Sequence, residues 1–212
     1  MTDTAPPPRP ARSAGRELKE KGLFEAARAV FAEEGFKGAT TAEIARRAGV
    51  PKANLHYYFP TKEALYRAVT EEILTDWLGA ASSFDEKDDP KEAITAYIGA
   101  KMDLARADPL GSRIWASEIL RGAPVIKDFL ETTLAEWIAS REAIMRRWIE
   151  AGKIRPLEPR YFFYMIWATT QHYADFEDQI RAINGGAPLS DEQFQKAKAQ
   201  AIDTILNGVM PL

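Results

Sequence analysis

The chain has 212 residues with a formal net charge of −3; 46% of the residues are hydrophobic and none is cysteine. This length and apolar content suffice for one or two helical cores, and the lack of cysteine excludes disulfides and cysteine metal sites. No apolar run approaches the roughly 20 residues that a membrane-spanning helix requires, and no signal peptide opens the chain. We therefore expect a cytoplasmic protein with no membrane partner.

The charges are distributed unevenly along the chain. Ten Lys and Arg residues and seven Asp and Glu residues lie between residues 1 and 60, so this part carries +3 and the remainder −6. A mildly basic N-terminal part permits local contact with DNA, although the total charge by itself argues against a nucleic-acid-binding protein.

Residues 1–14 are rich in Pro, Arg and Ala, a composition typical of a disordered arm. Arg9 or Arg12 could enter a minor groove, but a solvated tail is the simpler interpretation. A first helix is predicted from about residue 16 to residue 34, because apolar residues recur there at helical spacing and Gly35 follows.

Residues 38–65 contain two short amphipathic helices separated by a tight turn, Ala48-Gly49-Val50-Pro51. Gly49 can take a left-handed conformation after the first helix, and Pro51 suits the start of the second. Small apolar side chains on the first helix allow the second to cross it closely, as a helix-turn-helix requires. We expect a three-helix head that is closed by Phe24, Phe31, Phe36, Ile44, Leu55 and Phe59.

The second helix of this pair keeps polar and aromatic side chains on its outer side when Leu55 faces inward. An amide can read an adenine edge, rings can touch a thymine methyl group, and ammonium, imidazole and phenol groups can reach phosphates. This composition predicts a helix that lies in the major groove. The alternative is that the tyrosines are half-buried packing in an ordinary helical hairpin. The predicted DNA contacts on this helix are Lys52, Asn54, His56, Tyr57 and Tyr58.

The starts of two helices add further candidate DNA contacts. Thr40 and Thr41 begin the first helix of the pair, where hydroxyls and free N–H groups can hold a phosphate. Thr61 caps the helix that follows the pair, and Lys62 lies in its first turn, where the helix dipole disfavours a cation. We therefore interpret Lys62 as a contact to an external phosphate.

A long pattern at fixed spacing carries a resemblance to a known family. It reads Thr40-Thr41-x-x-Ile44-Ala45-x-x-Ala48-Gly49-Val50, then Tyr58-Phe59-x-x-Lys62-Glu63-x-Leu65. It resembles the DNA-binding domain of the TetR family of bacterial repressors, and residues 57–60, 121–124 and 165–176 resemble members that regulate pyrimidine utilisation. The resemblance implies a homodimer, a double-stranded DNA operator and a small-molecule effector. We expect a disordered arm at 1–14, a DNA-binding domain at 15–60 and a ligand-binding and dimerisation domain at 61–212.

The rest of the chain is predicted to be helical. A helix that starts after Thr61 and runs to residue 77 or 80 is interpreted as a lever, because one rigid element then belongs to both head and body. The acidic stretch 84–90 is expected to be a surface loop. The prediction is an all-α fold, a three-helix helix-turn-helix head plus a helical ligand-binding and dimerisation body. Further helices are expected at residues 91–107, 110–120, 125–150, 159–183 and 191–208.

Residues 161–168 are apolar on all sides, which predicts a buried helix. On the same helix Trp167, Gln171 and Asp175 share a face by their spacing. A planar, uncharged ring could stack on a tryptophan while the Gln171 amide matches a cyclic imide and Asp175 accepts a ring N–H. Uracil or thymine fits this description, and the resemblance implies the same class. The alternative is that Gln171 and Asp175 satisfy a helix end or lie at a subunit boundary.

The candidate ligand contacts are Trp77, Trp115, Trp167, Thr170, Gln171 and Asp175. Lys101 and Glu118 are expected to be solvated. The last two long helices are candidates for the dimer interface, because a two-fold pair of reading helices recognises both halves of a palindrome. The final helix carries an apolar stripe for this contact, although the stripe could instead pack within its own chain. The stripe consists of Phe194, Ala197, Ala201, Ile202 and Ile205.

Catalysis is not expected. His172 and Asp175 lie near each other, but no nucleophile, phosphate loop or metal motif accompanies them, so we predict no catalytic residue, metal or cofactor. The sequence predicts a nucleoid-associated repressor that a small planar molecule such as uracil or thymine releases from a palindromic operator. The alternatives are a TetR-type regulator of another hydrophobic or aromatic ligand, and an architectural DNA-binding protein without an effector.

Overall fold

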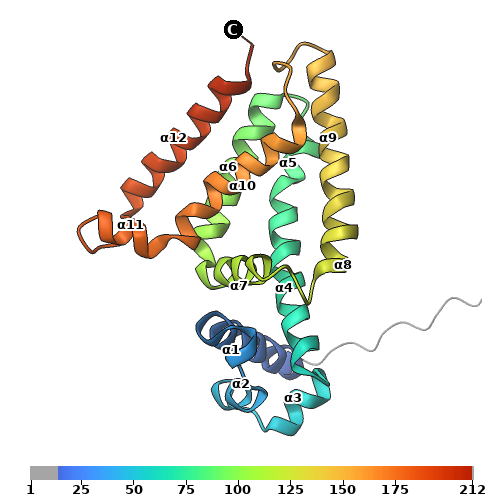
Figure 1. Ribbon diagram of the computed structural model, residues 1–212, viewed down its shortest axis with the longest axis vertical. Helices are drawn as coiled ribbons and strands as arrows, with labels where there is room; N and C mark the ends of the chain where they lie inside the picture. Colours follow the sequence, from blue (N-terminus) through green and yellow to red (C-terminus); the bar gives the residue numbers. More distant parts are fainter. Residues whose placement is uncertain (1–13, 212) are drawn as a thin grey trace, which may run out of the picture. The chain divides into compact units, whose positions relative to one another are not determined.

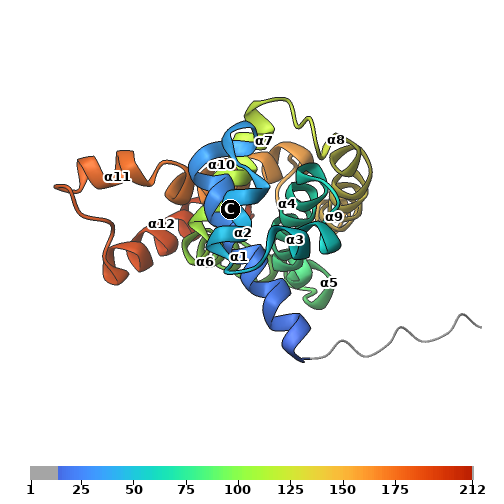
Figure 2. The same cartoon turned by 90° about the horizontal axis from the view of Figure 1, so that it is seen from below.

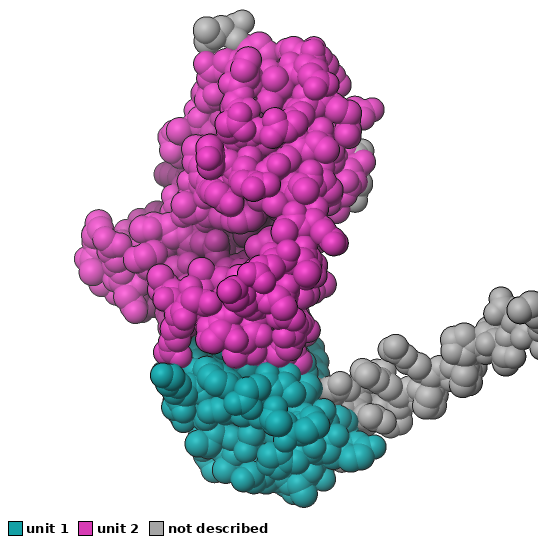
Figure 3. Space-filling view, turned by 45° about the vertical axis from the view of Figure 1, so that its right-hand side comes forward, with its two compact units in different colours: residues 1–66 teal, residues 67–212 magenta. Residues whose placement is uncertain are grey.

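The computed structural model describes residues 14–211, and all regular structure in that range is helical (Figures 1 and 2). The all-α prediction is confirmed. Residues 1–13, which hold most of the expected arm with Arg9 and Arg12, lie outside the described residues. The chain divides into two compact units, residues 1–66 and residues 67–212, which Figure 3 colours separately.

The first unit contains α1 (Ala14–Gly38), α2 (Thr41–Arg47), α3 (Lys52–Tyr58) and the first residues of α4 (Lys62–Gly79). The backbone of α1 leaves helical geometry at Gly35, whose φ of 67° favours glycine, so the helix is interrupted where the sequence predicts its end. All four helices contribute to the core of the unit, whose buried side chains include Leu23, Val30, Phe31, Ile44, Leu55 and Tyr66.

The turn between α2 and α3 has the predicted helix-turn-helix chemistry. Gly49 has a φ of 65°, and the Val50 N–H donates to the Ala45 carbonyl at 3.0 Å, which closes the end of α2. The Pro51 carbonyl accepts from the Asn54 N–H at 2.9 Å and so starts α3. Local hydrogen bonds therefore fix where the second short helix begins.

The second unit is built around α6 (Pro90–Ala107), which packs against α10 (Pro159–Asp175), α12 (Asp191–Val209) and α5 (Ser83–Glu86). In this unit α12 lies on one side of α6 and α9 on the other (Figures 1 and 2). The remaining elements are η1 (Ala80–Ser82), α7 (Pro109–Leu120), α8 (Lys127–Phe129), the π-helical turn η2 (Leu130–Leu134), α9 (Ala135–Glu150) and α11 (Glu177–Ile183).

Three elements differ from the sequence prediction. The stretch 84–90 is not a loop throughout, because Phe84 is 3% exposed, stacks on Trp148 with centroids 5.4 Å apart, and holds α5 against the core. The helix expected at 125–150 begins at Lys127 and contains the π-helical turn. The helix expected at 159–183 ends at Asp175, because Phe176 leaves helical geometry with a φ of −115° before α11 begins.

In the single chain, the helix that includes residues 161–168 is buried on one face only, whereas the sequence predicts burial on all sides. Its uniformly apolar sequence covers two faces, one packed in the core and one open in the single chain. The buried residues are Phe162, Phe163 and Ile166, and the exposed ones are Tyr161 at 68%, Tyr164 at 48% and Met165 at 45%.

The apolar stripe of the final helix is used within its own unit. Phe194, Ala201 and Ile205 are at most 8% exposed and belong to the core around α6. The prediction that these side chains face a partner subunit is therefore wrong, and the alternative of packing within the chain holds for them.

Candidate functional site

The outer face of α3 carries the side chains that the sequence predicts for DNA. Lys52, Asn54 and His56 are exposed, and Tyr57 is 74% exposed, so packing does not explain its ring. Tyr58 is half-buried and lies edge-on to Tyr57 with centroids 5.4 Å apart. The helix therefore presents an amide, an ammonium group, an imidazole and a phenol on one short surface.

The start of α2 is capped by Thr40. Its Oγ1 accepts from the Glu43 N–H at 3.1 Å, and both Thr40 and the half-buried Thr41 lie where a phosphate could approach the helix start. Hydrogen bonds from Arg46, and then from Arg47, hold the pKa of the Glu43 carboxyl down at about 2. Glu43 therefore stays charged and holds both guanidinium groups against α2.

Lys62 has a role inside the first unit that the sequence does not reveal. Its Nζ donates to the carbonyls of Phe36 at 2.7 Å and Ala39 at 2.9 Å, and lies 4.6 Å from the centroid of the Phe36 ring. These acceptors near the end of α1 give Lys62 a role in the fold, so its place in the first turn does not by itself indicate an external phosphate, and the phosphate contact stays a prediction. Two of the three ammonium N–H donors are used in this way. The predicted cap of the same helix is present, since Thr61 Oγ1 accepts from the Ala64 N–H at 3.0 Å.

A cavity of about 330 Å³, counted to its open mouth, lies within the second unit. Of the predicted ligand contacts, Trp77, Trp115, Trp167 and Gln171 line it. Trp77 and Trp115 meet edge-on with centroids 5.6 Å apart. The remaining lining residues are Leu74, Leu78, Tyr97, Lys101, Leu134 and Trp137.

Two predicted ligand contacts are satisfied elsewhere. Thr170 is fully buried, and its hydroxyl donates to the Ile166 carbonyl of its own helix at 2.8 Å. Asp175 accepts from the buried Ser112 hydroxyl of α7, and burial raises the pKa of the Asp175 carboxyl. Neither residue lines the cavity, so the sequence prediction needs correction at these two positions.

Lys101 and Glu118 are not solvated, which contradicts the sequence prediction. Lys101 is 5% exposed, lines the cavity, and holds its Nζ 4.5 Å from the centroid of the Trp77 ring. Glu118 is 1% exposed and accepts from the Val125 N–H at 2.7 Å. The helical period contained a signal for Lys101, because residue 101 falls one turn after Tyr97 on the buried face of α6.

Sequence reasoning also missed Tyr97 and Trp137. Trp167 Nε1 donates to the Tyr97 hydroxyl at 2.8 Å, which fixes the indole ring at the cavity wall. Within residues 14–211, the buried Trp137 Nε1 finds no hydrogen-bond acceptor. A buried N–H without an acceptor is costly, so this donor is a candidate for contact with a bound ligand.

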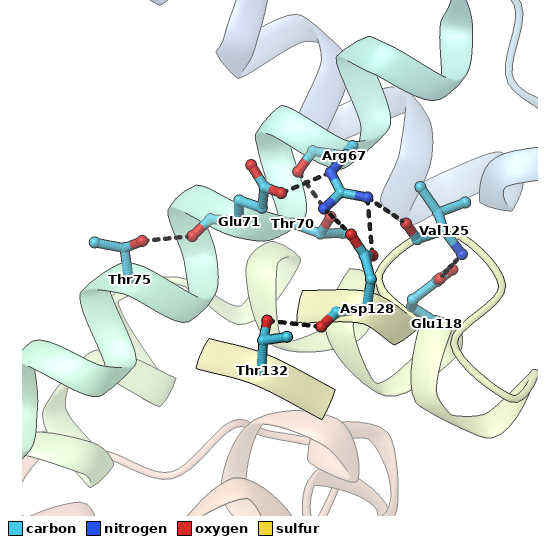
Figure 4. Close-up of polar contacts among 8 residues, drawn as sticks. All are labelled: Arg67, Thr70, Glu71, Thr75, Glu118, Val125, Asp128 and Thr132. Carbon is cyan, nitrogen blue, oxygen red and sulfur yellow. Dashed lines mark hydrogen bonds and ion pairs between the residues drawn. The ribbon is translucent and has the colours of Figure 1, made fainter. Parts of the chain in front are cut away.

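Arg67 connects α4 to the segment after α7 (Figure 4). Its guanidinium makes a two-pronged contact with Asp128 at 2.7 and 3.0 Å and donates to the Val125 carbonyl at 3.2 Å. Glu71 on the same helix accepts from Arg67 Nε at 2.7 Å. Since Glu118 holds the Val125 N–H, a continuous chain of hydrogen bonds joins α7, the following segment and α4.

The described residues contain neither a candidate metal site nor a candidate membrane-spanning helix. Between residues 14 and 211 no group of three or more His, Asp or Glu side chains is arranged to hold a metal ion. In the same range no helix is both long enough and apolar enough to cross a membrane.

Two family models together cover most of the chain. Residues 23–69 match "Bacterial regulatory proteins, tetR family", and residues 70–212 match "YcdC-like protein, C-terminal region". The HTH-type transcriptional regulator RutR of Escherichia coli K12 is 41% identical over 201 residues, which are 94% of each chain.

Solved structures show the same fold. The ketosteroid transcriptional regulator KstR2 of Mycobacterium tuberculosis superposes with a TM-score of 0.72 at 24% identity, covering 96% of this chain and all of the other. A transcriptional regulator from Streptomyces coelicolor gives a TM-score of 0.72 at 23% identity, covering 91% of this chain and 99% of its own. The chain therefore belongs to the TetR family, whose members are dimeric, ligand-responsive DNA-binding regulators of transcription and not enzymes.

Proposed function

We propose that the cavity of the second unit binds a 2,4-dioxopyrimidine, uracil or thymine, and that this ligand releases the protein from its operator. The observation that carries the proposal is the composition of the cavity wall, which combines indole rings with the primary amide of Gln171. Such a wall fits a small planar imide that stacks on rings and exchanges hydrogen bonds with an amide. The resemblance of the sequence to regulators of pyrimidine utilisation supports the same class of ligand.

The cavity is narrow and partly open, since its empty volume of about 330 Å³ includes solvent at the mouth. A larger hydrophobic ligand, which is the alternative, would need the indole walls to separate.

For DNA, we propose that α3 lies in the major groove. Asn54 and Tyr57 would contact base edges, while Lys52, His56 and Tyr58 would contact the backbone near the capped start of α2 with Thr40 and Thr41. The exposure of these α3 side chains supports the proposal, because an ordinary surface helix gains nothing from an exposed tyrosine ring.

We further propose that the dimer forms around the open face of α10 together with the outward side of α12. The open residues of α10 and Phe176, which directly follows it, recur at helical spacing and include four rings, and those of His172 and Phe176 stack with centroids 4.9 Å apart. A contiguous exposed apolar surface of this kind marks a protein contact. Its members are Tyr161, Tyr164, Met165, Ala168, His172 and Phe176.

The coupling between cavity and DNA is proposed to run along α4. This helix places Leu74, Trp77 and Leu78 at the cavity and Arg67 in the hydrogen-bonded network of Figure 4. A ligand that favours one position of α4 over another changes operator affinity, and a coupling free energy of only ~1–3 kcal/mol suffices.

Calorimetric titration of the full-length protein with uracil and thymine tests the ligand assignment. The Gln171→Ala variant should bind uracil about tenfold more weakly, because it loses hydrogen bonds at the cavity wall. The Gln179→Ala variant, which truncates an exposed amide on α11, is the matched control and should bind like the wild type. Wild-type protein that binds neither base contradicts the proposal, and equal binding by Gln171→Ala removes that residue from the site.

Release from DNA is measured separately. Fluorescence anisotropy on an operator selected from a random DNA pool should show that uracil weakens binding by the wild type. Unchanged operator affinity at saturating uracil contradicts the proposed release and favours an architectural protein.

A further inference from the structure

The cavity holds a buried positive charge that the fold leaves without a hydrogen-bond acceptor. Lys101 is 5% exposed and lines the cavity from α6. In the part of the chain that the structure describes, its Nζ contacts the Trp77 ring at 4.5 Å and donates no hydrogen bond. A buried ammonium group has three N–H donors and loses much free energy when none is satisfied.

The carboxylate that acts on Lys101 is occupied elsewhere. Asp175 on α10 favours the charged form of Lys101 through its own charge, but its carboxylate accepts from Ser112 and does not line the cavity. Burial dominates and lowers the pKa of Lys101 to about 8, with the Asp175 charge partly offsetting this. At neutral pH the ammonium group is therefore still protonated and able to donate.

Two arginines of the same unit that are more exposed than Lys101 each bind a carboxylate, although Arg141 Nε finds no acceptor in the described residues. The Arg141 guanidinium binds Asp85 at 2.7 Å, and the Arg67 guanidinium binds Asp128 at 2.7 Å. Lys101 thus differs from these arginines in facing a cavity instead of a carboxylate.

The lining of the cavity offers more donors than acceptors. The Trp137 indole N–H is buried without an acceptor in the described residues. The Tyr97 oxygen already accepts from Trp167 at 2.8 Å, which leaves its own proton to donate. Against these donors and Lys101, the acceptor among the polar lining side chains is the Gln171 carbonyl. A ligand that satisfies such a wall must bring at least two hydrogen-bond acceptors.

We propose that Lys101 is the specificity-determining residue of the effector site, its ammonium group donating to one of the two ring oxygens of the pyrimidine. This inference rests on the proposed function and adds to it a reason for a dioxo compound, whose two ring oxygens both accept hydrogen bonds. Replacing that oxygen by an amino group would place a donor against the ammonium group. A site with a buried donor rejects such an analogue strongly, because both donors are then left unsatisfied.

The experiment measures discrimination as well as affinity. Calorimetric titrations compare the full-length wild type with Lys101→Met and Lys101→Gln. Each protein is titrated with uracil and with two aminopyrimidines, cytosine and isocytosine. Each aminopyrimidine carries an amino group in place of one of the two ring oxygens of uracil. Lys91→Met, an exposed lysine of the same helix, is the matched control. Thermal unfolding tests whether each variant is folded. If Lys101→Met does not fold, Lys101→Gln, which retains a neutral hydrogen-bond donor, is used in its place.

Wild type should bind uracil and reject both aminopyrimidines. Lys101→Met should bind uracil about 10- to 100-fold more weakly, the loss expected for a hydrogen bond to a charged donor. It should also lose discrimination against one aminopyrimidine. This is the base whose amino group replaces the ring oxygen that Lys101 contacts. Lys101→Gln should be intermediate, and Lys91→Met should match the wild type.

The outcomes separate this inference from the proposed function. If the wild type binds uracil and Lys101→Met binds it equally well with the same discrimination, the role of Lys101 is overturned and the pyrimidine assignment stands. If uracil affinity falls but the discrimination against both aminopyrimidines is unchanged, Lys101 only supports the fold of the cavity and the inference is overturned. If the wild type binds none of the three bases, the proposed function and the role of Lys101 are both overturned.

Discussion

Lys62 in the first unit and Lys101 in the second share one local arrangement and differ in one respect. Each holds its ammonium group over an aromatic ring, 4.6 Å from the centroid of Phe36 and 4.5 Å from that of Trp77. Lys62 also donates to two backbone carbonyls, whereas Lys101 donates to no acceptor among the described residues. The first charge is thus satisfied by the fold of its own unit, and the second is left for a molecule that enters the cavity.

The contrast predicts opposite effects on stability when either lysine is changed to methionine. The largest effect is expected for Lys62→Met, which removes two hydrogen bonds from a charged donor and leaves two carbonyls at the end of α1 without a partner. We expect the free energy of unfolding to fall by about 3 kcal/mol. Urea unfolding followed by circular dichroism measures it, with the exposed Lys37→Met as control.

The same variant sharpens the assignment of Lys62. If its stability equals that of the wild type and its operator affinity falls evenly on all DNA sequences, Lys62 is a phosphate contact, as the sequence predicted. If stability falls as expected, the carbonyls of Phe36 and Ala39 are its main partners and it positions the start of α2.

Lys101→Met should instead stabilise the protein in the absence of a ligand. Burial lowers the pKa of Lys101 from 10.5 to about 8, so between these pH values the unfolded chain binds more protons and stability from this group rises with pH. Below pH 8 both states are protonated and the cost of the buried charge is fully present. We expect the free energy of unfolding of Lys101→Met to exceed that of the wild type by about 3 kcal/mol below pH 8, and the gain to vanish towards pH 10.5.

Urea unfolding of both proteins from pH 6 to pH 10 provides this measurement. A variant that is less stable than the wild type throughout would show that the contact with Trp77 outweighs the cost of burial. In that case Lys62 and Lys101 would both stabilise the folded protein, and their contributions to stability would differ less than their hydrogen bonds indicate.

The two lysines also show what the sequence could and could not predict. The turn at Gly49 and Pro51 and the caps at Thr40 and Thr61 use partners within a few residues, so residue type and spacing were sufficient. The acceptors of Lys62 lie 23 and 26 residues earlier in the chain, and no local pattern indicates them.

The cavity was predictable only in part for the same reason. Trp77, Trp115, Trp167 and Gln171 are predictable as ring and amide chemistry on the helices of the second unit, whereas Trp137 is not. Lys101 and Glu118 are predicted to be solvated because charged side chains usually are, and this prediction is wrong for both. The helical period nevertheless puts residue 101 on the buried face of α6. The pairing of Arg67 with Asp128 spans 61 residues, and only the packed structure reveals it.

Exposed side chains of α3 that the fold of the first unit does not use are expected to act on DNA instead. Asn54 is exposed on α3, and Asn54→Ala should change the preference for one base pair per half-site by about 1–3 kcal/mol, the value of a good amide contact to adenine. Selection of operators from a random pool by each protein measures the preference. An unchanged preference would contradict base reading by Asn54.

Lys52, also exposed on α3, provides the corresponding backbone contact. Lys52→Ala should weaken binding to all sequences alike and reduce the salt dependence by about one ion per subunit, because one phosphate contact is lost. Anisotropy titrations at several salt concentrations measure the slope. A change in sequence preference with an unaltered slope would assign Lys52 to a base edge instead.

The smallest effect is expected for Arg67, which has internal partners as Lys62 does and lies on the same helix, α4, one end of which carries Trp77 beneath Lys101. Arg67→Met breaks the link from α4 to Asp128 and Val125, so uracil should still bind while its effect on operator affinity shrinks by about 1 kcal/mol, or roughly fivefold. The ratio of operator affinities with and without uracil measures the coupling, and Arg181→Met, whose ion pair lies within α11, is the control. Because Lys101 binds the effector and Arg67 only transmits its effect, the two variants should differ in kind: Lys101→Met loses uracil affinity, and Arg67→Met keeps that affinity while losing response. An Arg67→Met protein that responds like the wild type would show that the coupling bypasses this network.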